Sequence, residues 1–343
     1  MKVALLGDLH WGVRKDSPVF HEFMGKFFRE EFFPYLKEHN IDTVIQAGDL
    51  FDNRKSVSPL TLQKSKEYFF DVMQDRNITC HAIIGNHDAF YRNSIILNSP
   101  DQFLNYSNLH LYATPTDVSI GGKSFLMLPW VCEENYLESK RAIVESSSDY
   151  CISHLELNGF IMQKGGQAFH GDKSYLSADD FKAFKQVYTG HFHTQSKNGN
   201  IHYIGIPFEM TWVDYADQKG FFVLDTITGE LEFVPTKATI YSRFDMTKGQ
   251  VVDRELVEGH YVKLIVDAAT NRSILDTIYG MEPIDVKVVD LSTFETDASS
   301  SVDELETYDE INILRHLVDE SNADSTMKKK MMTYLENLVA SSQ

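Results

Sequence analysis

Short apolar stretches alternate with longer amphipathic ones from residue 1 to about residue 235, and this alternation limits the possible folds more than any other feature. The stretches at residues 2–6, 43–47 and 79–84 are almost wholly apolar, so strands formed there need cover on both faces. After the first and second stretches, a Ser-Pro pair precedes a helical pattern and suits the start of a helix. The pattern predicts an α/β fold of βαβ units, built as one mixed sheet or as a two-sheet sandwich with helices outside.

Later segments predict hairpins and a second, smaller unit. Strand-like stretches flank Gly121-Gly122 and Thr228-Gly229, as expected for tight turns. A strand, a helix and a strand are then predicted within residues 240–290. We therefore predict four parts along the chain: a main domain at 1–238, a small α/β capping domain at 239–291, a Ser/Thr/Asp-rich linker at 292–302, and a tail of two amphipathic helices at 303–343.

Five polar stretches stand at the ends of predicted strands. They are Gly7-Asp8-Leu9-His10, Gly48-Asp49-Leu50-Phe51-Asp52, Gly85-Asn86-His87-Asp88, Ser153-His154 and Gly190-His191-Phe192-His193. Four of the five begin with glycine, which lets the backbone turn sharply as it leaves a sheet. Ligands of α/β sheets gather outside the carboxyl ends of the strands. We therefore expect these polar side chains to meet in one site.

The polar residues of these stretches are hard or borderline metal ligands. Seven of them offer a carboxylate, an amide or an imidazole: Asp8, His10, Asp49, Asn86, His154, His191 and His193. Such a set favours Mn, Fe, Zn or Mg over a Cys-based structural zinc. Seven ligands are too many for one ion but suit two ions that share a bridging carboxylate. Any one of these residues alone is more often a turn former or a structural histidine, so the prediction rests on all five stretches together.

The motif series GDLH, GDLFD, GNHD, a lone His and GHFH resembles that of the calcineurin-like metallophosphoesterases. The GDLFD form, followed by a helix that opens with Ser-Pro, is most similar to the SbcD-type nuclease subunits of DNA double-strand-break repair complexes. The short chain and helical tail look like the T-even phage version, a recombination endonuclease subunit. The resemblance covers about residues 1–290. It implies a two-sheet sandwich flanked by helices, with a small α/β capping domain and a helical C-terminal tail.

The resemblance also implies a role for each residue of the site. One ion would be held by Asp8, His10, Asp49 and His193, and the second by Asp49, Asn86, His154 and His191. His87 would be the catalytic residue that is not a ligand, meeting the phosphate and helping the leaving oxygen. Asp52 and Asp88 would orient the ligands, although some relatives carry His at the position of Asp52. The ions would be divalent, with Mn²⁺ favoured by the family and Mg²⁺ as the other choice.

The net charge of -18 would repel nucleic acid unless the basic residues gather in one place. Basic residues do follow the ligand motifs, on loops that should ring the site: Arg14, Lys15, Arg54, Lys55, Arg92, Lys164, Lys173 and Lys197. Such a rim would hold DNA phosphates without reading sequence, and Trp11, Phe90 and Tyr91 would stack on an unpaired base. The competing explanation is that Lys and Arg favour loops in any protein.

Residues 291–326 carry ten acidic residues and one basic residue, which is half of the net charge. A solvated linker explains part of this, and the amphipathic helices beyond it suit a groove on a partner. The resemblance implies that residues 303–343 dock on an SbcC-type coiled-coil ATPase. It also implies a homodimer, through helices expected near residues 59–76 and 93–106.

No apolar run approaches the roughly 18 to 20 residues of a membrane span, and the N-terminus does not look like a signal peptide. Three widely spaced cysteines suit a reduced compartment. We therefore expect a cytoplasmic protein, located in an infected bacterial host if the phage resemblance holds.

The resulting hypothesis is a manganese-dependent DNA nuclease that works with the ATPase in recombination, repair and replication. It would be an exonuclease on double-stranded ends and an endonuclease on single strands. One alternative is a phosphomonoesterase or cyclic-nucleotide phosphodiesterase on the same core. The other is a DNA-end or ATPase-binding subunit with a vestigial metal site. The presence of a suitable residue at every ligand position argues against this alternative.

Overall fold

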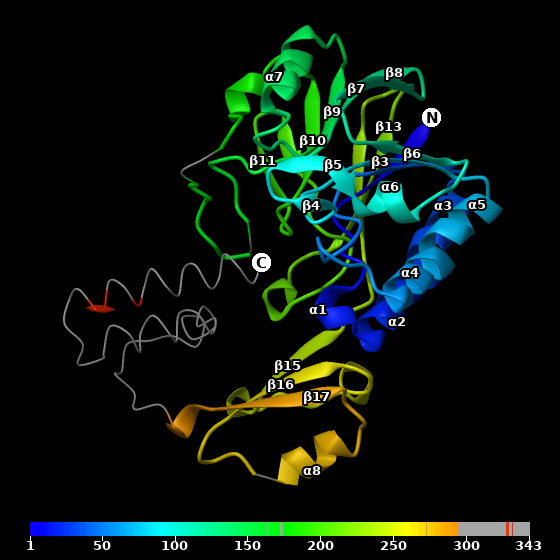
Figure 1. The fold of residues 1–343 in the computed structure, drawn as a ribbon. Coiled ribbons are helices and arrows are strands. Elements are labelled where there is room, and N and C mark those ends of the chain that lie inside the picture. The colour runs from blue at the N-terminus through cyan, green and yellow to red at the C-terminus, as the bar shows by residue number, and fades with distance from the viewer. Residues whose placement is uncertain (163, 172–173, 272, 294–326, 329–330, 332–343) are drawn as a thin grey trace. The chain divides into compact units, whose positions relative to one another are not determined.

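The computed structural model describes residues 1–162, 164–171, 174–271, 273–293, 327–328 and 331 (Figure 1). The chain divides into two compact units, of which the larger holds residues 1–244, 252–263 and 273–287, and the other holds the remaining described residues. In the part of the chain that the structure describes, no helix has the length and apolar character needed to cross a membrane. The four predicted parts of the chain remain a prediction, and 294–326 and most of 327–343 lie outside the described residues.

Two six-stranded sheets form the larger unit (Figure 1). The first has the order β14 (Leu231–Pro235), β13 (Gly220–Asp225), β1 (Lys2–Leu6), β2 (Thr43–Gln46), β3 (Thr79–Ile83), β6 (Leu109–Tyr112). The second has the order β11 (Ser196–Asn198), β12 (Ile201–Tyr203), β10 (Gln186–Gly190), β9 (Tyr150–His154), β8 (Lys123–Leu128), β7 (Thr116–Ile120). The pairings from β1 to β6 and from β12 to β8 are parallel, so the site-bearing strands of each sheet end on the same side.

The two sheets pack face to face, and helices cover an outer face. Along β1, Val3 and Leu5 belong to the apolar layer that also contains Phe125 of β8, whereas Ala4 and Leu6 belong to the layer of the Phe-rich helices. Successive side chains of a strand point to opposite faces, so a strand that is apolar throughout serves both layers. The structure therefore confirms the two-sheet sandwich and decides against the single mixed sheet.

The helices include two that begin at Pro18 and Pro59, as the two Ser-Pro pairs predict. The helices are α1 (Val13–Asp16), α2 (Pro18–Phe27), η1 (Phe28–Phe32), α3 (Phe33–Glu38), α4 (Pro59–Ser65), η2 (Lys66–Phe70), α5 (Asp71–Asp75), α6 (Ser99–Phe103), α7 (Tyr136–Glu145) and α8 (Ser273–Tyr279). Short turns of 3₁₀ helix are η3 (Ala178–Phe181), η4 (Trp212–Asp214), η5 (Met246–Lys248), η6 (Arg254–Leu256) and η7 (Leu291–Thr293). Ser58 caps α4, because its Oγ accepts a hydrogen bond from the Thr61 amide at 3.0 Å.

The helix expected at residues 93–106 is wrong. Strand β5 (Ser94–Asn98) pairs there with β4 (Ala89–Tyr91), and only α6 (Ser99–Phe103) is helical. The β-branched Ile95 and Ile96 favour a strand. Asn98 then accepts a hydrogen bond from the Asp101 amide at 3.0 Å, and this cap starts the helix only after the strand has ended.

A third sheet has the order β15 (Tyr241–Asp245), β16 (Tyr261–Val266), β17 (Asp285–Asp290). Helix α8 lies between β16 and β17 in the sequence, so the predicted strand, helix and strand are all present.

Candidate metal centre

The predicted ligands converge because they lie at the ends of five parallel strands, on neighbouring loops. These loops pack so closely that two of their glycines leave no space for a larger side chain. Gly48 has a φ of 91°, and a Cβ on it would lie 2.6 Å from Nδ1 of His154. A Cβ on Gly190 would lie 2.4 Å from Oδ1 of Asp8. Glycine is therefore required at both positions by close approach, and at Gly48 also by its left-handed backbone.

The first group of candidate ligands consists of Asp8, His10 and His193, which could hold a metal ion. The Nε2 atoms of His10 and His193 face each other at 3.2 Å, and they lie 3.8 and 3.9 Å from Oδ2 of Asp8. Nδ1 of His10 lies 3.2 Å from Oδ1 of Asp52, which directs the other ring nitrogen to the group.

The second group consists of Asp49, His154 and His191. Nδ1 of His154 donates to the carbonyl oxygen of Ala47 at 2.8 Å, so Nε2 is the ring nitrogen that faces the site. The amide of Asn86 lies between the two rings, 2.7 Å from Nε2 of His154 and 3.0 Å from Nδ1 of His191. Asn86 thus joins this group, as the motif series predicts.

Asp49 lies between the two groups. Its Oδ2 is 3.7 Å from Nε2 of His10 and 3.3 Å from Nε2 of His154. Its Oδ1 accepts a hydrogen bond from the His87 amide at 2.7 Å, which fixes the carboxylate. One carboxylate in contact with both groups is the arrangement that two closely spaced cations require.

The buried charges of the site are poorly balanced by the chain itself. Asp8 and Asp49 are both 1% exposed. Burial raises the pKa of Asp8 to about 7, with the Asp49 charge adding to the shift. Burial also acts on Asp49, but His154 and His87 overcome it and hold its pKa well below the usual range. Two buried carboxylates whose pKa values diverge indicate that the site favours added positive charge.

Burial and the neighbouring charges also change the pKa values of the site histidines. Burial lowers the pKa of His154, but Asp49 and Asp8 outweigh it and raise the value to about 9. Burial and the nearby charge of His154 hold the pKa of His191 well below its usual range, and burial with His10 lowers that of His193 to about 3. The rings that remain neutral are ready metal ligands, because a histidine must lose its proton to bind a metal. The donor set therefore fits divalent cations.

His87 and its neighbours have distinct positions. Nδ1 of His87 donates to the backbone oxygen of Asp52 at 2.6 Å, so Nε2 is the nitrogen available to a substrate. Burial lowers the pKa of His87, although Asp49 opposes the shift. With His10 and Asp52, His87 also forms a third group of possible metal ligands.

Asp88 contacts the backbone of the ligand loops, and its predicted role in orienting the ligands stays a prediction. Its carboxylate accepts hydrogen bonds from the Phe51 amide at 3.0 Å and the Gly85 amide at 2.9 Å. Asp88 therefore ties together the backbones of two ligand loops. Asp52 is the acidic residue that contacts a ligand ring.

The residues of the predicted basic rim have different surroundings in the structure. Arg54 reaches the centre, where its Nη2 lies 3.0 Å from the Asn86 amide oxygen when the amide nitrogen faces the two histidines. Burial lowers the pKa of Arg54, Asp49 opposes this shift, and the neighbouring charge of Arg92 adds to it. Arg54 is thus a predicted rim residue whose charge acts at the site, and Arg92 lies near enough to act on Arg54.

Other members of the rim have other partners or are simply exposed. Arg14 donates to the Met210 carbonyl at 3.1 Å and to the Tyr241 hydroxyl at 3.0 Å. Lys164 donates to the Ala216 carbonyl, and Lys197 lies on β11 opposite His202. Lys15 and Lys55 are exposed, and Lys173 lies outside the described residues.

Stacking of Trp11 on a base is wrong. Its side chain is 1% exposed and packs between the rings of His21 and Phe28, at 6.0 and 5.7 Å. A large indole beside a Phe-rich helix gains more from burial than from exposure on a loop. Tyr91 is 54% exposed and Phe90 is half-buried, so stacking by these two remains a prediction.

Two residues beside the site were not predicted from the sequence. The first is Trp130, whose ring lies 5.9 Å from that of His154 and 5.1 Å from that of His191. Its signal was its place just after an apolar strand, Lys123–Leu128, because every ligand also follows such a strand. The second is the buried Lys219, whose Nζ lies 2.9 Å from the backbone oxygen of His193. Nothing in the sequence distinguishes it from an exposed lysine.

Comparison with known proteins agrees with this geometry. The family model described as calcineurin-like phosphoesterase matches residues 1–195. The chain is 36% identical over 267 residues to exonuclease subunit 1 of Enterobacteria phage T4, which covers 78% of this chain and 77% of that protein. It is 14% identical to a solved structure titled as a novel archaeal phosphodiesterase, with a TM-score of 0.35 over 68% of this chain and 99% of that one. The last likeness is too low to support an argument.

Proposed function

Because the chain belongs to the calcineurin-like phosphoesterase family, we propose that it is a two-metal DNA nuclease, an exonuclease on double-stranded ends and an endonuclease on single strands. The position of Asp49 between two groups of ligands carries the proposal, because one Asp49 oxygen lies within 3.7 Å of His10 and 3.3 Å of His154. The exonuclease name of the phage relative supports a nucleic acid as the substrate, and DNA is the one we propose.

The proposed ligands follow from the two groups. Asp8, His10, Asp49 and His193 would hold one divalent cation, and Asp49, Asn86, His154 and His191 would hold the second. Mn²⁺ is the proposed ion, with Mg²⁺ as the other choice. When bound, such cations supply Lewis acidity that polarises a phosphodiester and activates water.

The chain's own residues would hold and complete this chemistry. Asp52 orients His10 through the contact of 3.2 Å. Arg54 brings a guanidinium to the edge of the centre, where it would pair with a phosphate oxygen. His87 presents Nε2 to the substrate, and the negative phosphate would raise its lowered pKa so that it can donate a proton to the leaving oxygen.

The test compares two substrates in the presence of Mn²⁺. Release of nucleotides from linear double-stranded DNA is measured beside hydrolysis of an aryl phosphomonoester, for the native chain and for Asp49→Asn. Asp75→Asn, on the exposed end of α5, is the control. DNA cleavage lost in Asp49→Asn and retained in Asp75→Asn supports the proposal. Fast monoester hydrolysis without DNA cleavage would establish the phosphatase alternative, and full activity of Asp49→Asn would refute the bridging role.

We propose in addition that the chain works as one subunit of an assembly, as the name of the phage relative suggests for that protein. The proposed partner is an SbcC-type ATPase bound through residues 303–343, after a main domain at 1–238, a capping domain at 239–291 and a linker at 292–302. Recombination, repair and replication in the cytoplasm of an infected bacterium would be its setting. Removal of 303–343 should abolish binding of the ATPase and leave Mn²⁺-dependent cleavage of short DNA intact; retained binding would contradict this role.

A homodimer is the second proposed interaction. The predicted contact at residues 93–106 now consists of β5 and α6 in place of a helix. Ile96 and Leu97 on β5 are 76% and 40% exposed, and Phe103 at the end of α6 is 40% exposed. Sedimentation of the native chain beside Ile96→Asp would test this surface: loss of a dimer in the variant supports it, and a monomeric native chain rejects it.

A further inference from the structure

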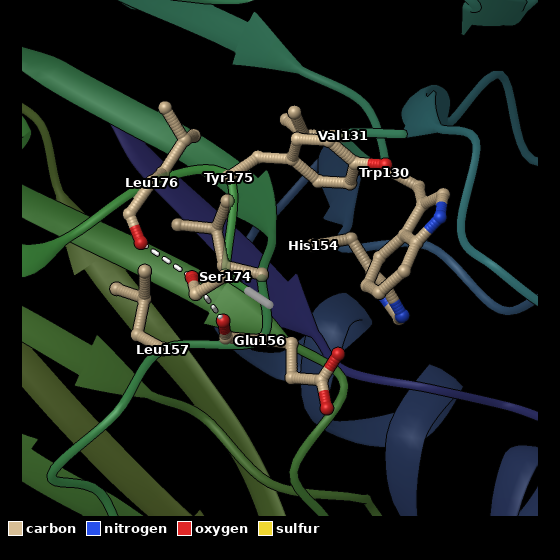
Figure 2. Close-up of a pocket in the computed structure, with 9 residues that line it drawn as sticks. Trp130, Val131, His154, Glu156, Leu157, Ser174, Tyr175 and Leu176 are labelled. Atoms are coloured by element: carbon tan, nitrogen blue, oxygen red, sulfur yellow. Dashed lines mark hydrogen bonds between the residues drawn. The ribbon is translucent and has the colours of Figure 1, made fainter. Parts of the chain in front are cut away.

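A pocket adjoins the metal centre, and the proposed chemistry does not use it. Three segments line it: Trp130 and Val131 after β8, His154 to Leu157 at the end of β9, and Ser174 to Leu176 (Figure 2). All three belong to the larger unit of the chain. The pocket is thus built by the ends of β8 and β9 and by the loop segment 174–176.

His154 is shared by the pocket and the metal centre. Its ring forms part of the pocket wall, whereas its Nε2 lies 2.7 Å from the Asn86 amide and 3.3 Å from Asp49. Figure 2 shows the His154 ring at the end of the pocket nearest Trp130. A nucleotide with its phosphate at the ligands would therefore have the pocket within the reach of its own sugar and base.

The walls have the chemistry of a base-binding site. Trp130 and Tyr175 are aromatic, and the other face of the Tyr175 ring is supported by Tyr136, with centroids 5.4 Å apart at 28°. Tyr175 is 43% exposed, so a base can reach it. Aromatic rings bind bases by stacking, and every base offers a flat face to them.

The carboxylate of Glu156 is the acidic group among the residues that line the pocket. Within the described residues the Glu156 carboxylate makes no hydrogen bond or ion pair, although the backbone oxygen of Glu156 accepts from the Ser174 hydroxyl at 3.0 Å. Glu156 follows β9, which ends at His154, and its side chain lines the pocket (Figure 2). A half-buried carboxylate needs hydrogen-bond donors, which a phosphodiester or a sugar ring oxygen cannot supply and the N–H groups of a base can.

We propose that this pocket binds the nucleobase of the nucleotide whose phosphate is cleaved, with Tyr175 stacking on the base and Glu156 accepting its N–H groups. This inference rests on the proposed nuclease function. Guanine presents two adjacent donors, N1–H and the N2 amino group, to a carboxylate that has two acceptor oxygens. Thymine presents one N–H between two carbonyl oxygens, which the carboxylate repels. The pocket should therefore favour guanine most and thymine least.

The test measures cleavage of four oligonucleotide sets that differ only in the base at the scissile nucleotide, and a fifth with an abasic residue there. The native chain should cleave the guanine substrate about tenfold faster than the thymine one, the discrimination of one well-made hydrogen-bond pair to a base. Glu156→Gln should reduce this ratio to near one. Glu138→Gln, an exposed change on α7, should leave both the ratio and the rates unchanged.

Tyr175→Ala distinguishes base stacking from a purely structural role of Tyr175, because only the loss of stacking would affect base-containing and abasic substrates differently. It should slow cleavage of the base-containing substrates about tenfold, as expected for one lost stacking contact, and leave the abasic substrate at the native rate. Equal losses on both kinds of substrate, or equal native rates on all four bases, would overturn the inference. Absence of any DNA cleavage by the native chain would instead overturn the proposed function itself, so the two failures are distinguishable.

Discussion

Replacement of Lys219 by methionine tests how the ligand loop of His193 is held. Lys219 is 5% exposed, and its Nζ lies 2.9 Å from Oδ1 of Asp214, 2.8 Å from Oδ2 of Asp217 and 2.9 Å from the His193 carbonyl oxygen. Methionine keeps most of the volume but removes the charge and all three contacts. The variant would leave Asp214, itself 4% exposed, without its counter-ion.

The expected loss of stability is about 3 to 4 kcal/mol at pH 7. Removing one partner of a buried ion pair typically costs about 3–5 kcal/mol, because the other charge stays buried and unpaired. Asp214 can avoid the penalty by taking up a proton, and from its ordinary pKa of 3.8 this costs about 4 kcal/mol at pH 7. The cost of protonating Asp214 therefore sets the upper limit of the stability lost in Lys219→Met.

Urea unfolding of the metal-free chain, followed by circular dichroism, measures this loss. The control is Lys185→Met, because Lys185 forms a pair of the same length, 2.9 Å, with Asp149 but is 66% exposed. We expect little change in the free energy of unfolding for the control. A Lys219→Met variant as stable as the control would refute the argument.

The effect of pH has a definite sign. Burial raises the pKa of Asp214, but Lys219 outweighs it and lowers the value below 3.8 in the folded chain. The stabilisation by this pair is therefore complete above the ordinary pKa and is lost as the pH falls through the folded value. The difference between the native chain and Lys219→Met should shrink as the pH falls to about 4 and below. A difference that grows on acidification would contradict the ion-pair explanation.

Three further predictions concern the metal centre. His87→Asn should lower turnover by about 10²- to 10⁴-fold and leave metal affinity nearly unchanged in calorimetry; an equal loss of both would make His87 a ligand. Asp52→Asn should weaken metal binding by about 10- to 100-fold, because His10 loses its orienting contact of 3.2 Å; native affinity would exclude that role. Gly48→Ala should lower the free energy of unfolding by at least about 1 kcal/mol more than Gly122→Ala does, which is roughly the cost of an overpacked site. Both glycines have positive φ, but only at Gly48 would the added Cβ lie 2.6 Å from a side-chain atom. Equal thermal stability of the two variants would show that the contact relaxes freely.

The sandwich and the convergence of the candidate ligands were predictable because each depends on a local pattern. An apolar strand with no polar face must be buried on both sides, and residues that follow parallel strands meet at one end of a sheet. His10, Asp49 and His154 therefore come together from segments far apart in the chain.

Features that depend on three-dimensional context were not predictable. The apolar pattern at residues 93–106 suits a helix or a strand, and the pairing of β5 with β4 decides between them. Trp11 follows a ligand motif but faces the helix layer. Lys219 acts through neighbours brought close only by folding, and it belongs to no local motif.

The central claim is that Asp49 joins two metal sites, and titration of Mn²⁺ into the metal-free chain tests it most directly. Calorimetry gives the number of ions, and electron paramagnetic resonance reports whether two Mn²⁺ ions lie close enough to couple. We predict two ions per native chain with a coupled signal, and loss of that coupling in Asp49→Asn. A single ion per native chain, or a coupled pair that survives in Asp49→Asn, would contradict the account.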